Sequence, residues 1–373
     1  MHFIFFFLIL IIYCAACFYI ARRIIRFATS RVVKIAIGIG VALLTFLMPI
    51  QRMAVDVVPE GINRVLYLVS TLWLVVVMYA SIILLILGLA RYIAKKKNGD
   101  VPEEKPTTMW HTLVIVCIII VAGIFNAYNP VFTSYSVSTE MPNDTLHRHF
   151  ATSVRIALVS DIHLGYAVRS GDCEKLVGMI NSTEADICII AGDVFDGDVR
   201  PVVDNDLGKS LAEIKSRFGT YAVIGNHEYM GDADVAADYI RERGITVLRD
   251  SAMKVGPFWI IGRDDLSVRR VGRERVSLDS LANRALPQIV VDHQPGALRE
   301  SVEAGAFLHL SGHTHAGQVW PMNFLTGLAY DIDYGHEKWN GMDVVVTSGF
   351  GTWGPRMRLG NHAEVVVIDV EIQ

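Results

Sequence analysis

The first 132 residues are dominated by long apolar runs. Four of these runs approach or exceed the roughly 20 residues that a membrane-spanning helix needs. They lie at residues 3–20, 32–50, 65–90 and 110–132. Lys34 lies near the start of the second run, where a lysine can extend its ammonium group to the membrane interface. The pattern therefore predicts a membrane anchor of about four helices over residues 1–132.

A cleaved signal peptide is an alternative interpretation of the first run. No Lys or Arg precedes the apolar stretch, and Arg22 and Arg23 follow it where a signal peptide has a small-residue cleavage site. Ala15, Ala16 and Cys17 faintly resemble a lipoprotein processing site, but the basic segment that precedes such sites is missing. Both alternatives are minor beside a retained helix.

Positive charges predict the orientation of this anchor. They gather around two of the three junctions between runs, and the second junction is sparsely charged. The two basic junctions contain Arg22, Arg23, Arg26, Arg31 and Lys34, and Arg91, Lys95, Lys96, Lys97 and Lys105. Because basic loops stay in the cytoplasm, the chain after the fourth run should face the periplasm or the cell exterior. One missed or false span would reverse this orientation. The runs contain no Asp or Glu, which favours anchoring over an ion pathway.

After residue 132 the pattern changes to short apolar strands interleaved with amphipathic helices. The predicted strands are residues 134–139, 154–159, 187–191, 221–224, 258–261, 288–291, 307–310, 344–347 and 364–370. The predicted helices are residues 171–181, 211–217 and 235–243, and residues 141–152 are polar and turn-prone. This alternation predicts a layered α/β domain with largely buried sheets over residues 133–373.

Composition changes this picture little. The hydrophobic content of 52% and the mean hydropathy of +0.38 come from the apolar first part of the chain. The formal net charge of -4 gives no case for a nucleic-acid partner. Cys188 lies in an apolar run, which favours a buried free thiol, although a bridge to Cys173 stays open if this part is extracytoplasmic.

Five short polar signatures follow the ends of predicted strands. In chain order they are Asp161-Ile162-His163, Gly192-Asp193, Gly225-Asn226-His227-Glu228, His293 and Gly312-His313-Thr314-His315. In α/β sheets the carboxyl ends of strands are where sites form. The signatures offer oxygen and imidazole ligands and no thiolate, which suits hard-to-borderline divalent cations, with enough groups for two ions.

Each signature alone is weak. Asp-x-His and Gly-Asp are common in turns, and a lone His293 is more often structural than a ligand. Gly312-His313-Thr314-His315 is stronger, because two His at i and i+2 in an extended chain point to one side. Their joint occurrence, always at strand ends, makes a set of unrelated surface turns improbable.

As a set, these signatures resemble the calcineurin-like metallophosphoesterase superfamily, and within it the membrane-anchored bacterial phosphoesterases. The stretch at residues 349–360 also resembles the closing segment of that family, and the resemblance covers residues 133–373. It implies an α/β/β/α sandwich and two divalent metal ions. Asp161, His163 and His315 would hold one ion, Asn226, His293 and His313 the other, and Asp193 would bridge them.

The resemblance also implies a reaction. A metal-bound hydroxide would attack the phosphorus of a phosphate mono- or diester in line, and the cations would stabilise charge on the phosphoryl oxygens. His227 would act near the leaving group as a general acid or hydrogen-bond donor. Mn, Fe and Zn all suit these ligands. The anchor makes an envelope or lipid-linked substrate attractive, and Trp320, Phe324, Trp339 and Trp353 are candidates for an apolar approach or for core.

Other interpretations remain at this point. A non-catalytic metal-binding sensor or interaction module would be favoured by a missing ligand, and none is missing. A transporter is disfavoured by the carboxylate-free runs. Glu228 is expected either to orient His227 or to be exposed, and Asp264 and Asp265 are expected to form a solvated turn. The oligomeric state does not follow from the sequence.

Overall fold

A computed structural model describes residues 2–98, 105–141 and 153–373, and the chain divides into two compact units, Met1–Gly123 and Ile124–Gln373. The first unit consists of α1 (His2–Arg26), α2 (Arg31–Ala54), α3 (Glu60–Asn98) and most of α4 (Thr107–Ala127). All four helices are long and apolar enough to cross a membrane. The predicted turn at residues 141–152 lies, apart from Met141, outside the described residues.

Polar side chains set the helix boundaries in the first unit. The hydroxyl of Ser30 accepts a hydrogen bond from the Val32 amide and caps α2. The amide of Asn63 donates to the carbonyl oxygens of Val55 and Val58, which closes the turn between α2 and α3. These bonds satisfy backbone groups that helix ends leave without partners.

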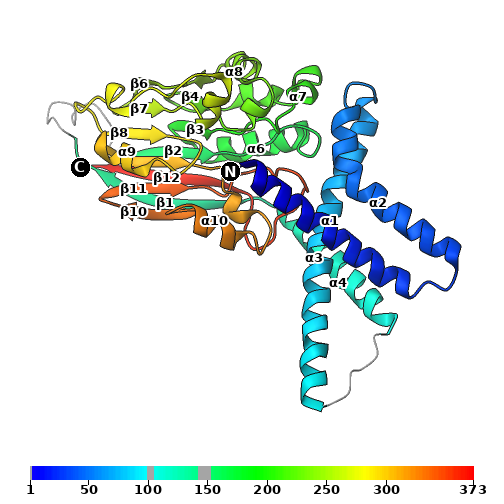
Figure 1. The fold of residues 1–373 in the computed structure, drawn as a ribbon. Helices are drawn as coiled ribbons and strands as arrows, with labels where there is room; N and C mark the ends of the chain where they lie inside the picture. Colours follow the sequence, from blue (N-terminus) through cyan, green and yellow to red (C-terminus); the bar gives the residue numbers. More distant parts are fainter. Residues whose placement is uncertain (1, 99–104, 142–152) are drawn as a thin grey trace. The chain divides into compact units, whose positions relative to one another are not determined.

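The second unit contains two six-stranded sheets (Figure 1). The first has the order β1-β12-β2-β3-β4-β5 and the second the order β10-β11-β9-β8-β7-β6. The first sheet comprises β1 (Val131–Thr139), β2 (Ser153–Val159), β3 (Ile187–Ala191), β4 (Thr220–Val223), β5 (Thr246–Val247) and β12 (Glu364–Ile372). The second comprises β6 (Ser251–Val255), β7 (Phe258–Gly262), β8 (Gln288–Val291), β9 (Ala306–Ser311), β10 (Gly335–Trp339) and β11 (Met342–Val346).

Helices cover the outer faces of both sheets. Apolar side chains of the two sheets meet in one central core, which includes Ile189 and Leu308. A second core joins the first sheet to α6 (Ser170–Ser182) and α8 (Ala233–Arg241), and a third joins the second sheet to α9 (Leu298–Glu303). The predicted α/β/β/α sandwich is therefore confirmed. Strands such as β3 are buried along their whole length, as expected for strands packed on both faces.

Most predicted strands coincide with observed strands within one or two residues. The fourth apolar run differs, because its helix ends at Ala127 and Val131 already pairs with Glu364 in the sheet. The predicted helix at residues 211–217 was wrong. A 3₁₀ helix, Lys209–Glu213, stands there, and the side chain of Asn181 binds both the Glu213 carbonyl and the Lys215 amide in place of a further turn.

All five cysteines are free, and Cys173 and Cys188 are fully buried. Burial raises the pKa of the Cys173 thiol to about 11 and that of the Cys188 thiol to about 12. The expectation of a buried free thiol at Cys188 is confirmed.

Candidate metal centre

The five signatures lie at one edge of the sandwich because their strands run in parallel. Strands β2, β3 and β4 are parallel neighbours in the first sheet, and β8 and β9 are parallel neighbours in the second. Backbone hydrogen bonds join the loops that follow them. The Asp161 amide donates to the Gly192 carbonyl (3.0 Å), and the Gly312 amide donates to the His293 carbonyl (3.0 Å).

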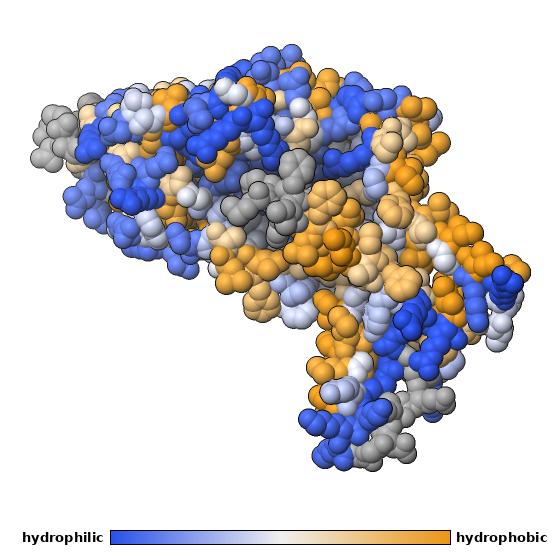
Figure 2. Space-filling view, viewed as in Figure 1, coloured by the Kyte–Doolittle hydropathy of each residue, from blue (hydrophilic) through white to orange (hydrophobic). Residues whose placement is uncertain are grey.

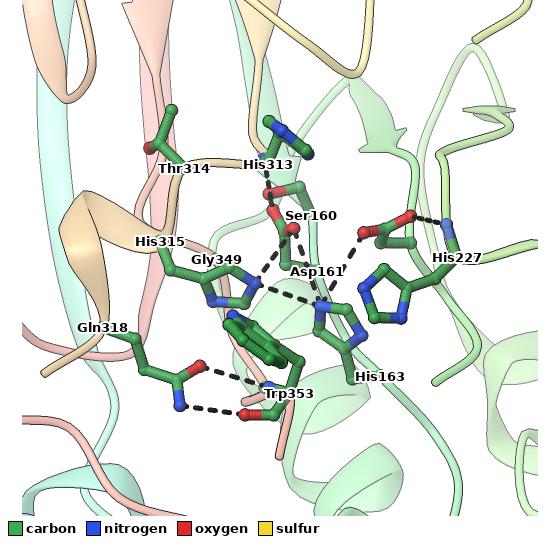
Figure 3. Close-up of polar contacts among 12 residues, drawn as sticks. Ser160, Asp161, His163, His227, His313, Thr314, His315, Gln318, Gly349 and Trp353 are labelled. Atoms are coloured by element: carbon green, nitrogen blue, oxygen red, sulfur yellow. Dashed lines mark hydrogen bonds and ion pairs between the residues drawn. The ribbon is translucent and has the colours of Figure 1, made fainter. Parts of the chain in front are cut away.

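The first group of ligand candidates is Asp161, His163 and His315, all of them buried. Asp161 Oδ1 lies 3.2 Å from His315 Nε2 and 3.7 Å from His163 Nε2. The Nε2 atoms of the two imidazoles face each other at 3.0 Å, as Figure 3 shows. One buried point is therefore surrounded by a carboxylate oxygen and two ring nitrogens.

The second group is Asp193, His293 and His313, with Asn226 beside it. His293 Nε2 lies 3.1 Å from Asp193 Oδ2 and 3.1 Å from Asn226 Oδ1. His293 Nδ1 is 2.8 Å from the Ala191 carbonyl oxygen, which leaves Nε2 to face the group. Asp193 Oδ2 is also 3.8 Å from His163 Nε2, so this carboxylate lies between the two groups.

The backbone is strained at most of these positions. Asp161, His163, Asp193, His313 and His315 all have positive φ values, between 52° and 72°. A positive φ is uncommon for residues other than glycine and costs about 1–3 kcal/mol at each position. Five such residues in one small region indicate that the fold holds the side chains in place at the expense of local backbone stability.

The donor set fits divalent cations. Asp161 Oδ1 is fully buried and has no hydrogen-bond partner among the described residues. Burial opposes ionisation of Asp161 and Asp193, yet His315 and His293 beside them hold the carboxyl pKa values well below the usual range. Asp161 and Asp196, followed by Asp193, raise the pKa of His163 to about 10 despite its burial. Because buried carboxylates that stay ionised attract cations, this donor set is suited to divalent metal ions.

Comparisons with known proteins agree with this geometry. The family described as calcineurin-like phosphoesterase matches residues 154–317. An uncharacterized metallophosphoesterase of Aquifex aeolicus is 30% identical over 259 residues, which are 67% of this chain and 98% of that protein. A transmembrane protein with metallophosphoesterase domain from Danio rerio is 31% identical over 274 residues, which are 69% of this chain and 61% of that protein.

The chain belongs to the calcineurin-like phosphoesterase family. It is a metal-dependent phosphoric ester hydrolase, as its relatives named metallophosphoesterases indicate. Among solved structures, a dimetal phosphatase from Danio rerio is similar with a TM-score of 0.35 and 11% identity, over 53% of this chain and 89% of that one.

His227 and His313 are the two partly exposed imidazoles of this phosphoesterase site, and the other three are buried. The His227 side chain is 15% exposed, whereas His163 and His293 are fully buried. The ring packs edge-on against that of His163 at 4.5 Å, and the backbone amide donates to Asp193 Oδ1 (2.9 Å). This ring is held beside the candidate ligands, yet it remains within reach of a substrate.

Asp196 is a site residue that the sequence interpretation missed. Its Oδ1 lies 3.6 Å from His163 Nδ1 and 3.5 Å from His227 Nδ1, so one carboxylate faces the far side of both rings. It comes three residues after Asp193, behind the same strand. The sequence signal that could have identified Asp196 is its position three residues after Asp193, which itself follows the end of a strand.

Glu228 has neither of its expected roles. It is fully buried, and its carboxylate accepts hydrogen bonds from the backbone amides of Asp193 (3.2 Å), Phe195 (2.9 Å) and Gly225 (2.8 Å). Burial, together with the charge of Asp193, raises the pKa of Glu228. Glu228 therefore fixes two ligand loops to each other and does not orient His227.

The expectation of a solvated turn at Asp264 and Asp265 was wrong. Both side chains are buried, and Asp264 accepts hydrogen bonds from Tyr229 (2.6 Å) and Arg249 (3.1 Å). Asp265 accepts one from the side chain of Gln294 (2.7 Å), the residue after His293. The pair is buried because segments far apart in the sequence supply its donors.

The closing segment supports the first ligand group. The Phe350 amide donates to the Ser160 carbonyl (3.0 Å), and the Gly351 amide donates to the Asp161 carbonyl (2.7 Å). Arg358 is fully buried, and its Nη2 donates to three carbonyl oxygens of residues 348–351 and lies 3.3 Å from His315 Nδ1. Burial lowers the pKa of this guanidinium to about 10.

Proposed function

We propose that this phosphoesterase is anchored in a membrane and hydrolyses a phosphate mono- or diester at a centre of two divalent metal ions. The observation that carries the proposal is the position of Asp193 between two groups of mostly buried candidate ligands. A carboxylate has two oxygens, so it can serve two cations at once. Mn, Fe and Zn all suit carboxylate, amide and imidazole ligands.

Each ligand has a proposed place. Asp161, His163 and His315 would hold one ion, Asn226, His293 and His313 the other, and Asp193 would contact both. When bound, the two cations would lower the pKa of a coordinated water and offset charge on the phosphoryl oxygens. Neutral Asn and His ligands limit the negative charge around the pair, which favours the approach of an anionic phosphate ester.

Residues of the chain then perform the remaining steps. His227 would donate a hydrogen bond or a proton to the leaving-group oxygen, since its ring is partly open beside the buried ligands. Asp196 would hold the rings of His227 and His163 through their Nδ1 atoms. Arg358 would hold the orientation of His315 from behind.

Metal analysis of the purified chain, combined with a panel of phosphomonoesters and diesters, tests this proposal. The expected result is about two metal ions per chain and hydrolysis that is lost on chelation and restored by added metal. A folded, metal-loaded protein that hydrolyses no member of the panel would favour the non-catalytic alternative.

We further propose that the domain lies outside the cytoplasm and acts on an envelope or lipid-linked substrate. The distribution of Lys and Arg around the apolar helices supports this orientation. A reporter fused after Gln373 tests it, and a cytoplasmic signal would overturn it. Cleavage of soluble nucleotides far faster than lipid-linked phosphates would overturn the substrate proposal.

A further inference from the structure

An uncharged segment with exposed apolar side chains follows the last ligand signature. Residues 318–330 contain no Asp, Glu, Lys or Arg, and they include α10 (Asn323–Ala329). Its exposed large apolar side chains are Trp320 (45%), Phe324 (62%), Leu325 (59%) and Leu328 (85%), and Trp353 is exposed nearby (52%). We call these five residues the α10 face, and Figure 2 shows apolar side chains gathered at the position of α10.

The α10 face borders the candidate metal centre. Gln318 lies three residues after His315, and its side chain makes two hydrogen bonds with the backbone of Trp353, one at 3.0 Å to the carbonyl and one at 3.1 Å from the amide. Figure 3 shows these two bonds between Gln318 and Trp353. Tyr330, the last residue of the segment, packs edge-on against His313 with ring centroids 5.9 Å apart, so the segment lies next to an imidazole that would hold a metal ion.

The α10 face is also joined to the end of α4. The last turn of α4 belongs to the second unit, and there Asn126 donates to the carbonyl oxygens of Arg358 (3.1 Å) and Asn361 (2.6 Å). Leu359, between them, donates to the Gln318 carbonyl (2.9 Å) and accepts from the Trp320 amide (2.7 Å). One short segment thus holds the end of an apolar helix on one side and the start of the α10 face on the other.

We propose that the α10 face inserts into the interfacial layer of the bilayer that the chain itself spans, and this rests on the proposed membrane anchoring. If α4 crosses the membrane, its end at Ala127 lies near the bilayer surface, and the hydrogen bonds of Asn126 bring the α10 face to the same level. Trp and Phe are well suited to that layer, and without charged residues the segment has no ions to desolvate there.

The size of the α10 face favours lipid over a protein partner. Five side chains of roughly 200 Å² each, about three-fifths exposed, present about 600 Å². That is less than the ~800 Å² that each partner contributes to a standard protein–protein interface. Helix α10 is about 10 Å long, a length that fits within the interfacial layer when the helix lies flat.

Lipid-quenching measurements on the full chain in proteoliposomes test the proposal. An environment-sensitive fluorophore is attached at L328C, with V235C on α8 as the matched control, because Val235 is also an exposed apolar residue (42%). The unsubstituted chain gives the background from the native cysteines. We expect quenching by acyl-chain spin labels to be several-fold stronger at position 328, and unchanged by salt or by the fraction of anionic lipid.

Two results would overturn the proposal. One is equal quenching at positions 328 and 235. The other is a label at position 328 that is shielded from lipid but self-quenches as the protein density rises, since a second copy of the chain would then cover the face. Neither result depends on hydrolysis, so the proposed reaction can fail while the docking proposal stands.

A charge substitution provides the functional arm. Leu328→Glu should move a label at L325C out of reach of the lipid quencher, while Val235→Glu should leave it in place. With unchanged metal content, Leu328→Glu should slow hydrolysis of a phosphate ester embedded in vesicles and leave a soluble aryl phosphate unaffected. Unchanged quenching in Leu328→Glu would contradict the insertion of α10.

Discussion

Two layers of polar residues make up the candidate metal centre, and they differ in the hydrogen-bond partners of their side-chain atoms. The proposed ligand layer consists of Asp161, His163, Asp193, Asn226, His293, His313 and His315. The supporting layer consists of Asp196, Glu228 and Arg358. Ligand atoms such as Asp161 Oδ1 face an interior point without a hydrogen-bond partner among the described residues, whereas the Glu228 carboxylate accepts three backbone amides.

This difference separates two uses of a buried charge. A buried carboxylate with too few hydrogen-bond donors destabilises the fold, unless a bound cation compensates for the lost hydration. A buried carboxylate that accepts several amides is part of the scaffold. Burial alone therefore does not identify a ligand, because Asp161 and Glu228 are both fully buried. Substitutions in the two layers should consequently fail in different ways.

The largest effect is expected at the residue shared by both ligand groups. Asp193→Asn should abolish hydrolysis, with a loss of at least about 10³-fold, because an amide cannot offer two anionic oxygens to two cations. Metal analysis should show fewer than two ions per chain. Removal of metal from the unsubstituted chain by a chelator should reproduce the loss reversibly. Full metal content and full activity in Asp193→Asn would contradict the assignment of Asp193 to the ligand layer.

The substitution His227→Gln tests a residue of neither layer, since His227 is proposed to act on the substrate and not on the metals. We expect a loss in kcat of about 10²–10⁴-fold with unchanged metal content. The loss should be smaller for a substrate with a good leaving group, because that group needs less protonation. An equal loss for good and poor leaving groups would contradict the proposed role as a general acid.

Sequence patterns placed the proposed ligands at strand ends, but they did not predict the supporting layer. Apolar strands end in sharp turns, so local periodicity could place Asp161 and His315 each at the end of a strand, although these strands belong to different sheets. The burial of Glu228 depends on amides of Phe195 and Gly225, which only the folded chain brings together. The strand β10 escaped prediction because an edge strand with the sequence Gly-His-Glu-Lys-Trp has no apolar run to reveal it.

Asp196→Asn should have a smaller effect than either substitution above. The amide can still lie near the Nδ1 atoms of His163 and His227, but it brings no negative charge to them. Supporting residues of metal ligands typically affect metal affinity or activity by about 10–100-fold, and we expect a loss in this range. Metal titration and kcat measured on the same preparation will show which ring depends more on Asp196. A loss as large as that of Asp193→Asn would move Asp196 into the ligand layer.

Glu228→Gln should have the smallest effect on chemistry and act mainly on stability. The variant should lose about 1–3 kcal/mol in the free energy of unfolding, because a side-chain amide offers one acceptor oxygen to the three backbone amides, whereas a carboxyl group offers two. Since burial raises the pKa of Glu228, the folded protein binds its proton more tightly than the unfolded chain does. The contribution of Glu228 is thus greatest at acid pH and declines as the pH rises through the folded-state pKa. Denaturant unfolding of chelator-treated protein at several pH values should show the deficit of the variant shrinking toward neutral pH. A deficit that grows toward neutral pH would mean that the ionised carboxylate is the form the scaffold needs.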